Sequence, residues 1–275
     1  MLKAMLNRLG WAATVSDPCV YYRVAHSYQL MVVHVDDLIV TYSDQGQIDS
    51  LIEGLSQEVK LADLGELKHA LGLDFITKDN KIVISQRTYV LDVLKRFGFD
   101  KCHPSPTPVH ENREEYEGSV LDKHTGLSKH PLNEIVGSLL WLSVMTRPDI
   151  SFSVATLAQF VSKPEPKVYS MASRILRYLP GTKDVGIGFI VGNKQNLHGY
   201  ADSDWAADKT TRKSQSGFTF FTNGPVDWSS TKQSSVSLSS AVGRGDGLLQ
   251  CHLDRDHDSL LDRVVHETKT NVDVF

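Results

Sequence analysis

Two adjacent aspartates, Asp36 and Asp37, interrupt an apolar, β-branched run at residues 31–40. Such a run predicts two short strands. A strand interior is a poor place for two negative charges, because like charges repel and burial raises the cost. A turn between the strands would instead place both carboxylates at an exposed tip, where Mg²⁺, which prefers oxygen ligands, can neutralise them. The run therefore predicts a hairpin and leaves two interpretations of its tip, a metal site for phosphoryl chemistry or an ordinary turn.

Composition limits the class of protein. A chain of 275 residues with 41% hydrophobic and 23% charged residues can bury one large core or two smaller ones. No stretch approaches the roughly 20 apolar residues that cross a bilayer, so we expect no membrane partner. Three scattered cysteines predict neither a disulfide framework nor a cysteine-rich zinc site, and we expect an intracellular protein of the cytoplasm or nucleus. The net charge of −4 is evidence against a strongly basic nucleic-acid binder.

The spacing of apolar residues predicts an α+β fold. Helical periodicity covers residues 2–10, 46–59, 86–97, 132–146, 149–162 and 166–179. Strand-like runs cover residues 19–24, 30–42, 67–77, 81–85, 185–190, 197–201, 217–222 and 226–229. Gly98 is a natural helix stop, and clustered prolines and glutamates mark a linker, which we place at residues 110–130.

Read in order, the chain contains a series of informative stretches at 16–21, 34–38, 71–75, 85–90, 107–108, 135–142, 146–150, 174–179, 200–206, 214–217 and 228–233. Through these stretches the chain resembles the reverse transcriptase and ribonuclease H portion of the Ty1/copia retrotransposon polyprotein. The resemblance runs from about residue 6 to residue 241. It implies a partial polymerase palm with a helical connection, followed by an incomplete ribonuclease H-like mixed sheet.

The resemblance assigns Asp36 and Asp37 to the paired catalytic, metal-binding aspartates of the palm hairpin, within a Tyr-x-Asp-Asp pattern. His34 stands at the usual tyrosine position. At such a site two Mg²⁺ or Mn²⁺ ions clamp the attacking 3′-oxygen and the leaving pyrophosphate. In the family an upstream strand supplies a third aspartate. We expect this chain to begin after that strand, and to lack polymerase activity by itself because ligands for the metal are missing.

A second site follows from the resemblance in the same way. Asp202 matches the first catalytic, metal-binding aspartate of the family's ribonuclease H domain, and we expect Asp204 to face solvent. The family's next carboxylate is a glutamate on a helix. After residue 241, however, this sequence departs from the family, and three glycines stand where the helix should form. Each is unfavourable in a helix by about 1 kcal/mol relative to alanine. We expect this site to be inactive as well.

Three basic residues follow the strand of Asp202. Lys209, Arg212 and Lys213 lie where the phosphates of an RNA–DNA hybrid would pass, so we expect them to contact the nucleic-acid backbone.

The expected organisation is a partial palm at 1–109, a linker at 110–130, a helical connection at 131–185, an incomplete ribonuclease H-like domain at 186–241 and a divergent tail at 242–275. We expect the tail to be disordered or loosely helical. The expected function is that of a truncated reverse transcriptase and ribonuclease H derivative, ancestrally an RNA-directed DNA polymerase, that binds a primer–template or an RNA–DNA hybrid and is inactive alone. Two alternatives stay open: activity in trans with another Pol fragment, and a non-enzymatic protein that pairs with the intact element protein and interferes with it.

Overall fold

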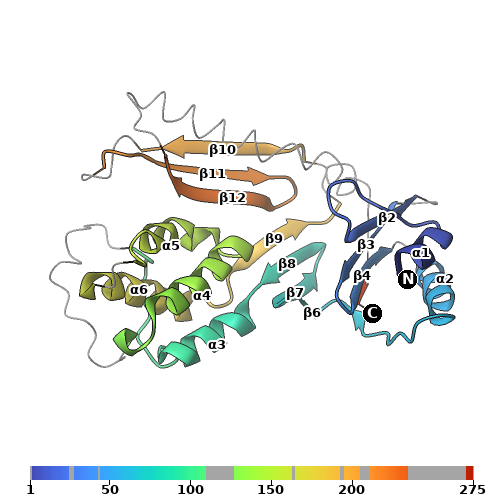
Figure 1. Ribbon diagram of the computed structural model, residues 1–275, viewed down its shortest axis with the longest axis horizontal. Coiled ribbons are helices and arrows are strands. Elements are labelled where there is room, and N and C mark those ends of the chain that lie inside the picture. Colours follow the sequence, from blue (N-terminus) through green and yellow to red (C-terminus); the bar gives the residue numbers. More distant parts are fainter. Residues whose placement is uncertain are drawn as a thin grey trace. The chain divides into compact units, whose positions relative to one another are not determined.

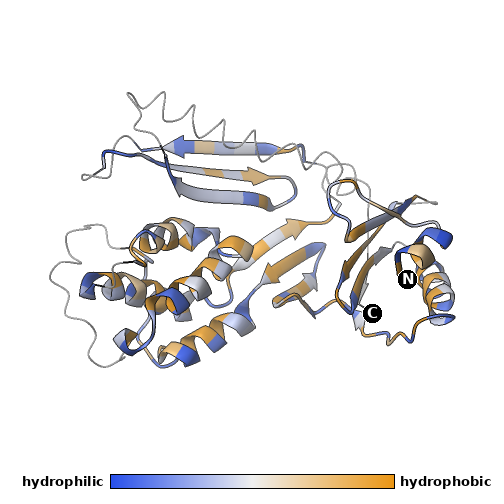
Figure 2. Cartoon of the chain, in the orientation of Figure 1, coloured by the Kyte–Doolittle hydropathy of each residue, from blue (hydrophilic) through white to orange (hydrophobic). Residues whose placement is uncertain are grey.

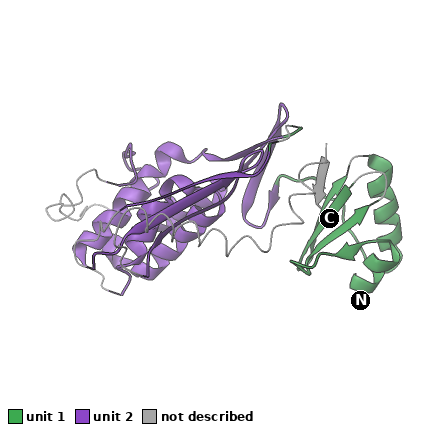
Figure 3. Cartoon of the chain, turned by 90° about the horizontal axis from the view of Figure 1, so that it is seen from above, with its two compact units in different colours: residues 1–68, 191–195, 252–275 green, residues 69–190, 196–251 purple. Residues whose placement is uncertain are grey.

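The computed structural model describes residues 2–24, 28–42, 44–109, 127–162, 165–192, 195–204, 211–234 and 271–274. Its helices and antiparallel sheets confirm the predicted α+β class. None of the described helices is long and apolar enough to cross a membrane. The chain divides into two compact units (Figure 3): unit 1 comprises residues 1–68, 191–195 and 252–275, and unit 2 comprises residues 69–190 and 196–251. This division falls after residue 68, whereas the sequence placed the first boundary at residue 109.

Unit 1 contains a six-stranded antiparallel sheet in the order β1-β2-β3-β4-β13-β5 (Figure 1). Its strands are β1 (Ala12–Ala13), β2 (Val20–Val24), β3 (Tyr28–His34), β4 (Asp37–Tyr42), β5 (Gly65–Glu66) and β13 (Asn271–Val274). Strand β13 pairs with both β4 and β5. For residues 271–274 the expectation of a disordered or loosely helical tail is therefore wrong, because the edge of β4 offers backbone hydrogen bonds to an extended segment. The rest of the tail from residue 242 lies outside the described residues.

Helices α1 (Leu2–Arg8) and α2 (Gln45–Ser56) share one hydrophobic core with this sheet. Met31 of β3 and Leu38 and Val40 of β4 are almost fully buried in it. Figure 2 shows hydrophobic residues along both strands. Since successive strand residues point to opposite faces, this burial pattern identifies the face of the sheet that packs on the core.

Unit 2 holds two further sheets, β6-β7-β8-β9 and β10-β11-β12. The strands are β6 (His69–Ala70), β7 (Leu73–Lys78), β8 (Lys81–Ser85), β9 (Gly186–Ile190), β10 (His198–Ser203), β11 (Gln215–Phe221) and β12 (Pro225–Lys232). Strand β9 pairs with β8, although we grouped residues 186–190 with the later strands. All pairings among the described strands are antiparallel, so the expected mixed sheet is not found among them. Parallel pairs need a crossover connection, and β10, β11 and β12 follow one another without one.

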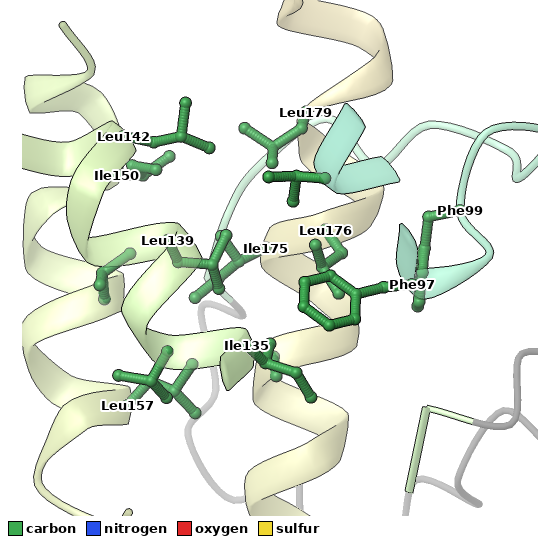
Figure 4. Close-up of a cluster of buried hydrophobic side chains, with 14 of the residues drawn as sticks. Phe97, Phe99, Ile135, Leu139, Leu142, Ile150, Leu157, Ile175, Leu176 and Leu179 are labelled. Carbon is green, nitrogen blue, oxygen red and sulfur yellow. The ribbon is translucent and has the colours of Figure 1, made fainter. Parts of the chain in front are cut away.

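Four helices form the main core of unit 2, namely α3 (Arg87–Phe97), α4 (Leu132–Met145), α5 (Ser151–Ala158) and α6 (Pro166–Tyr178). Short 3-10 helices lie at Leu127–Lys129, Pro148–Ile150 and Pro180–Thr182. Figure 4 shows how side chains from separate helices meet, with Phe97, Leu139, Leu157 and Leu176 among those that point into one cluster. Each is at most 1% exposed, so this cluster supplies most of the apolar burial that holds the helices together.

Helix α3 begins and ends as its sequence predicts. The Asp74 carboxylate accepts hydrogen bonds from Thr88 N (3.0 Å) and Thr88 Oγ1 (3.0 Å), and so satisfies a backbone donor in the first turn. At the other end Gly98 adopts a left-handed conformation (φ 77°), which a glycine enters without a steric penalty. The hydrogen bonds between Asp74 and Thr88 therefore connect two of the matching sequence stretches, 71–75 and 85–90.

Candidate functional site

The aspartate pair lies at the tip of the β3–β4 hairpin, as predicted. Strand β3 ends at His34 and β4 begins at Asp37, and these two residues pair across the hairpin. Val35 and Asp36 form the two-residue turn, and both are exposed. Val35 has φ 53°, a left-handed conformation that a β-branched residue rarely adopts. A strained turn of this kind is held by the surrounding sheet and is a recognised mark of functional sites.

Asp37 lies on the sheet face opposite the core. Its neighbours Leu38 and Val40 are buried against the helices, so strand alternation places Asp37 and Ile39 on the other face. His34, directly opposite Asp37, shares that face. The tip therefore offers two carboxylates and one imidazole near the open side of the sheet.

These groups do not make a complete metal centre. Carboxylate oxygens suit Mg²⁺, but this ion needs near-octahedral ligands and holds its waters. Within the described parts of the chain, no group of three or more histidine, cysteine, aspartate or glutamate side chains is arranged to hold a metal ion. A Mg²⁺ ion at this tip would therefore need ligands beyond the aspartate pair, from substrate phosphates, water or further protein groups.

The second predicted site lies in unit 2. Asp202 is exposed on β10 and stands opposite Gly217 of β11. Asp204 does not simply face solvent: its Oδ1 accepts a hydrogen bond from Gln215 N (2.8 Å), and its own N–H donates to Gln215 O (3.1 Å). Asp204 therefore closes the end of the β10–β11 pair, a structural role that the sequence reading missed. The signal that could have indicated it is the position of Asp204 directly after the strand that carries Asp202.

Two of the three predicted basic residues can be placed. Arg212 is exposed with φ 55°, and Lys213 is half-buried. Both precede β11 and lie beyond the end of the sheet that carries Asp202, since Ser203 pairs with Ser216. Lys209 lies outside the described residues.

Unit 2 also holds a buried ionic cluster within residues 146–150, a stretch that matches the family and for which the sequence predicted no ion pair. Arg147, 1% exposed, donates to Asp149 through Nε (2.9 Å) and Nη2 (2.7 Å). It also donates to Thr182 O (3.0 Å) and Thr182 Oγ1 (2.7 Å), and its guanidinium lies over the ring of Tyr178. The Thr-Arg-Pro-Asp stretch thus joins neighbouring segments of unit 2 through a buried, hydrogen-bonded arginine. The sequence signal for this role was an arginine placed between two apolar helices.

This cluster shifts two pKa values. Burial alone would raise the pKa of Asp149, but hydrogen bonds from Arg147 and its positive charge outweigh burial and hold that pKa below the ordinary 3.8. Burial, followed by the charge of Asp149, raises the pKa of Tyr178 above its ordinary 10.0. Both shifts follow from burial and from the contacts among Arg147, Asp149 and Tyr178.

Comparisons with known proteins identify relatives of this chain. The family model described as reverse transcriptase (RNA-dependent DNA polymerase) matches residues 1–111. The chain is 35% identical over 243 residues to the retrovirus-related Pol polyprotein from transposon RE1 of Arabidopsis thaliana, an alignment that covers 87% of this chain and 16% of that protein. It is 32% identical over 234 residues to the Pol polyprotein from transposon TNT 1-94 of Nicotiana tabacum, with 82% and 18% covered. No solved structure matches significantly.

A shorter relative has nearly the same extent. An uncharacterized mitochondrial protein of Arabidopsis thaliana is 32% identical over 215 residues, which cover 76% of this chain and 86% of that protein. Against the two transposon polyproteins, by contrast, the chain spans less than a fifth of their length.

Proposed function

Because this chain belongs to the reverse transcriptase family of copia-type retrotransposon Pol polyproteins, we propose that it derives from an RNA-directed DNA polymerase. Its β3–β4 hairpin carries the two aspartates of the polymerase site, and the chain alone does not extend a primer. The Ty1/copia resemblance and the match over residues 1–111 support the first statement. The incomplete ligand set at the tip supports the second.

The observation that carries the proposal is the strained tip. A valine held at φ 53° between His34 and the aspartate pair is costly, by about 1–3 kcal/mol, and a plain hairpin turn would use glycine or asparagine there. The turn instead keeps an apolar residue and exposes two carboxylates. In a complete site the divalent metal would stabilise the charge that develops on the transferred phosphoryl group. In this chain the role of Asp36 and Asp37 is to hold part of that ion's shell.

The second part of the proposal concerns unit 2. We assign β10–β12 to an incomplete ribonuclease H-like sheet, with Asp202 as its remaining metal-binding aspartate. Lys209, Arg212 and Lys213 follow β10 and would contact the phosphates of a primer–template or an RNA–DNA hybrid. The functional division proposed is a palm-derived part at 1–109, a linker, a helical connection at 131–185 and this sheet.

Primer extension tests the proposal. Purified full-length chain is given Mg²⁺, deoxynucleotides and a primed RNA template, beside an Asp36→Asn/Asp37→Asn control. We expect no incorporation from either protein, with folding verified by circular dichroism, while both bind the primed template. Incorporation that disappears in the double variant would overturn the inactivity and show that other groups complete the metal site. Failure to bind any primer–template would overturn the nucleic-acid assignment.

A second candidate is a non-enzymatic partner of an intact element protein, or one that acts in trans with it. One observation favours it: an uncharacterized mitochondrial protein of Arabidopsis thaliana matches this chain over 86% of its own length, so the similarity is not limited to the long Pol polyproteins. Adding this chain to an active polymerase of the same family would distinguish the cases. Reduced extension favours interference, and restored extension by a polymerase inactivated in its own Asp-Asp pair favours activity in trans.

A further inference from the structure

A proline-rich segment, residues 103–109, is fastened to helix α6, and we name it the proline strap. Proline stands at every second position from residue 104 to residue 108, which favours extended backbone. The strap contains Ser105-Pro106 and Thr107-Pro108, and these are the only Ser-Pro or Thr-Pro dipeptides in the sequence. Both are minimal acceptor sequences for kinases that require proline after the acceptor.

Two arginines of α6 hold the strap. Arg174 Nη2 donates to Thr107 Oγ1 (2.8 Å), and Arg177 Nε donates to the backbone oxygen of His103 (3.2 Å). In return Ser105 N donates to the backbone oxygen of Arg177 (2.8 Å). A guanidinium therefore already contacts the hydroxyl of Thr107.

The two hydroxyls of the strap differ in access. Ser105 is 7% exposed, and its Oγ donates to the backbone oxygen of Thr107 (3.0 Å). Thr107 is exposed, and its Oγ1 donates to the backbone oxygen of Val109 (2.8 Å). A kinase that approaches the folded chain can reach Thr107 but not Ser105.

The charges around Thr107 suit a phosphate. Besides Arg174 and Arg177, the exposed acidic or basic side chains within the described residues 100–109 are Asp100, Lys101 and His103, so basic groups outnumber the one carboxylate in this part of the chain. A phosphate beside a guanidinium gains charge-assisted, often paired, hydrogen bonds. The existing contact of 2.8 Å means that the basic partner needs little movement to meet it.

We propose that Thr107 is a phosphorylation site for a proline-directed serine/threonine kinase, with Arg174 as the partner of the phosphate. The Thr107 oxygen attacks the γ-phosphorus of ATP. A new O–P bond forms as the bond from that phosphorus to the β–γ bridging oxygen breaks, the hydroxyl proton passes to the kinase's base, and ADP leaves. The product dianion loses the hydrogen bond to Val109 and gains bonds from the Arg174 guanidinium, which tightens the strap on α6.

The first test needs no variant. The full chain and a synthetic peptide of residues 99–113 are each incubated with ATP and a purified proline-directed kinase, and the phosphorylated sites are mapped by mass spectrometry. We expect the peptide to accept phosphate on both Ser105 and Thr107, and the folded chain on Thr107 alone. No phosphate on Thr107 in the chain, or equal phosphate on Ser105, would overturn the proposal, as would a peptide that the kinase ignores.

The second test concerns the arginine. Phosphorylated chain should melt about 2–4 °C higher than untreated chain, and should resist proteolysis within the strap. The matched control is Arg174→Gln, which keeps a donor for Thr107 but removes the charge, and here phosphate should give no rise. A rise of equal size in Arg174→Gln, or a lower melting temperature in the phosphorylated wild type, contradicts the role of Arg174. Neither readout depends on polymerase activity, so this proposal and the proposed function can fail separately.

Discussion

Removal of the Arg147 side chain should be among the most damaging single changes in unit 2. The guanidinium makes four hydrogen bonds, two to Asp149 and two to Thr182, and lies over Tyr178. Arg147→Ala removes the guanidinium donors of the partly buried Asp149 carboxylate and of the Thr182 backbone oxygen, and it opens a cavity among the helices. We therefore expect this substitution to lower the free energy of unfolding.

The magnitude follows from burial. Truncating one partner of a buried ion pair costs about 3–5 kcal/mol. The Asp149 side chain keeps 29% of its surface exposed, so water partly solvates the abandoned charge and the lower end applies, about 3 kcal/mol. For a unit of this size that loss corresponds to a fall of about 6–12 °C in melting temperature.

The dependence on pH separates this mechanism from simple loss of volume. The folded-state pKa of Asp149 is depressed, so the stability it contributes is present above pH 3.8 and is lost as pH falls through the lower folded value. The cost of Arg147→Ala should accordingly be full at pH 7 and shrink below about pH 4. Urea unfolding at pH 7 and pH 3.5, followed by circular dichroism, measures both. A cost below 1 kcal/mol at pH 7, or one that is unchanged in an Asp149→Ala background, would refute the reasoning.

Three further changes have defined outcomes. Val35→Gly should stabilise unit 1 by about 1 kcal/mol in urea unfolding, because glycine adopts φ 53° without strain, whereas Val35→Ile should change little. Gly224→Ala should lower the melting temperature by several degrees, because its Cβ would lie 2.3 Å from the backbone oxygen of Gly188, while the control Gly188→Ala meets nothing within 4 Å. The pKa of Tyr178 is raised, so its contribution is present below pH 10.0 and lost as pH rises through the folded value; Tyr178→Phe should flatten the alkaline fall in melting temperature.

Local pattern predicted the elements of this fold because the apolar spacing and the end signals agree within each segment. In α3 the buried residues Val90, Val93, Leu94 and Phe97 recur with helical period, and Gly98 ends the helix where the sequence placed its stop. The hairpin was predictable for the same reason, because the charged pair Asp36 and Asp37 interrupts a β-branched run at the position where the turn lies.

Pairing between distant segments was not predictable from the pattern. Nothing in residues 81–85 specifies that Ile84 pairs with Ile187, because any half-buried strand edge would satisfy either segment. The roles of single polar groups were hidden for a related reason. Asp204 and Asp149 look like surface carboxylates in sequence, and only their neighbours in space, Gln215 N and Arg147, turn them into structural groups.

The placement of β13 beside β4 has a consequence for synthesis on the ribosome. Unit 1 takes its strands from residues 12–66 and from residues 271–274, and all of unit 2 is inserted between these two segments. Unit 2 can collapse while translation is still in progress, but the sheet of unit 1 stays open at β4 until residues 271–274 emerge. Unit 1 should therefore complete its folding later and more slowly than unit 2. Until β13 pairs with β4, the unpaired edge of β4 makes nascent chains most prone to associate with one another.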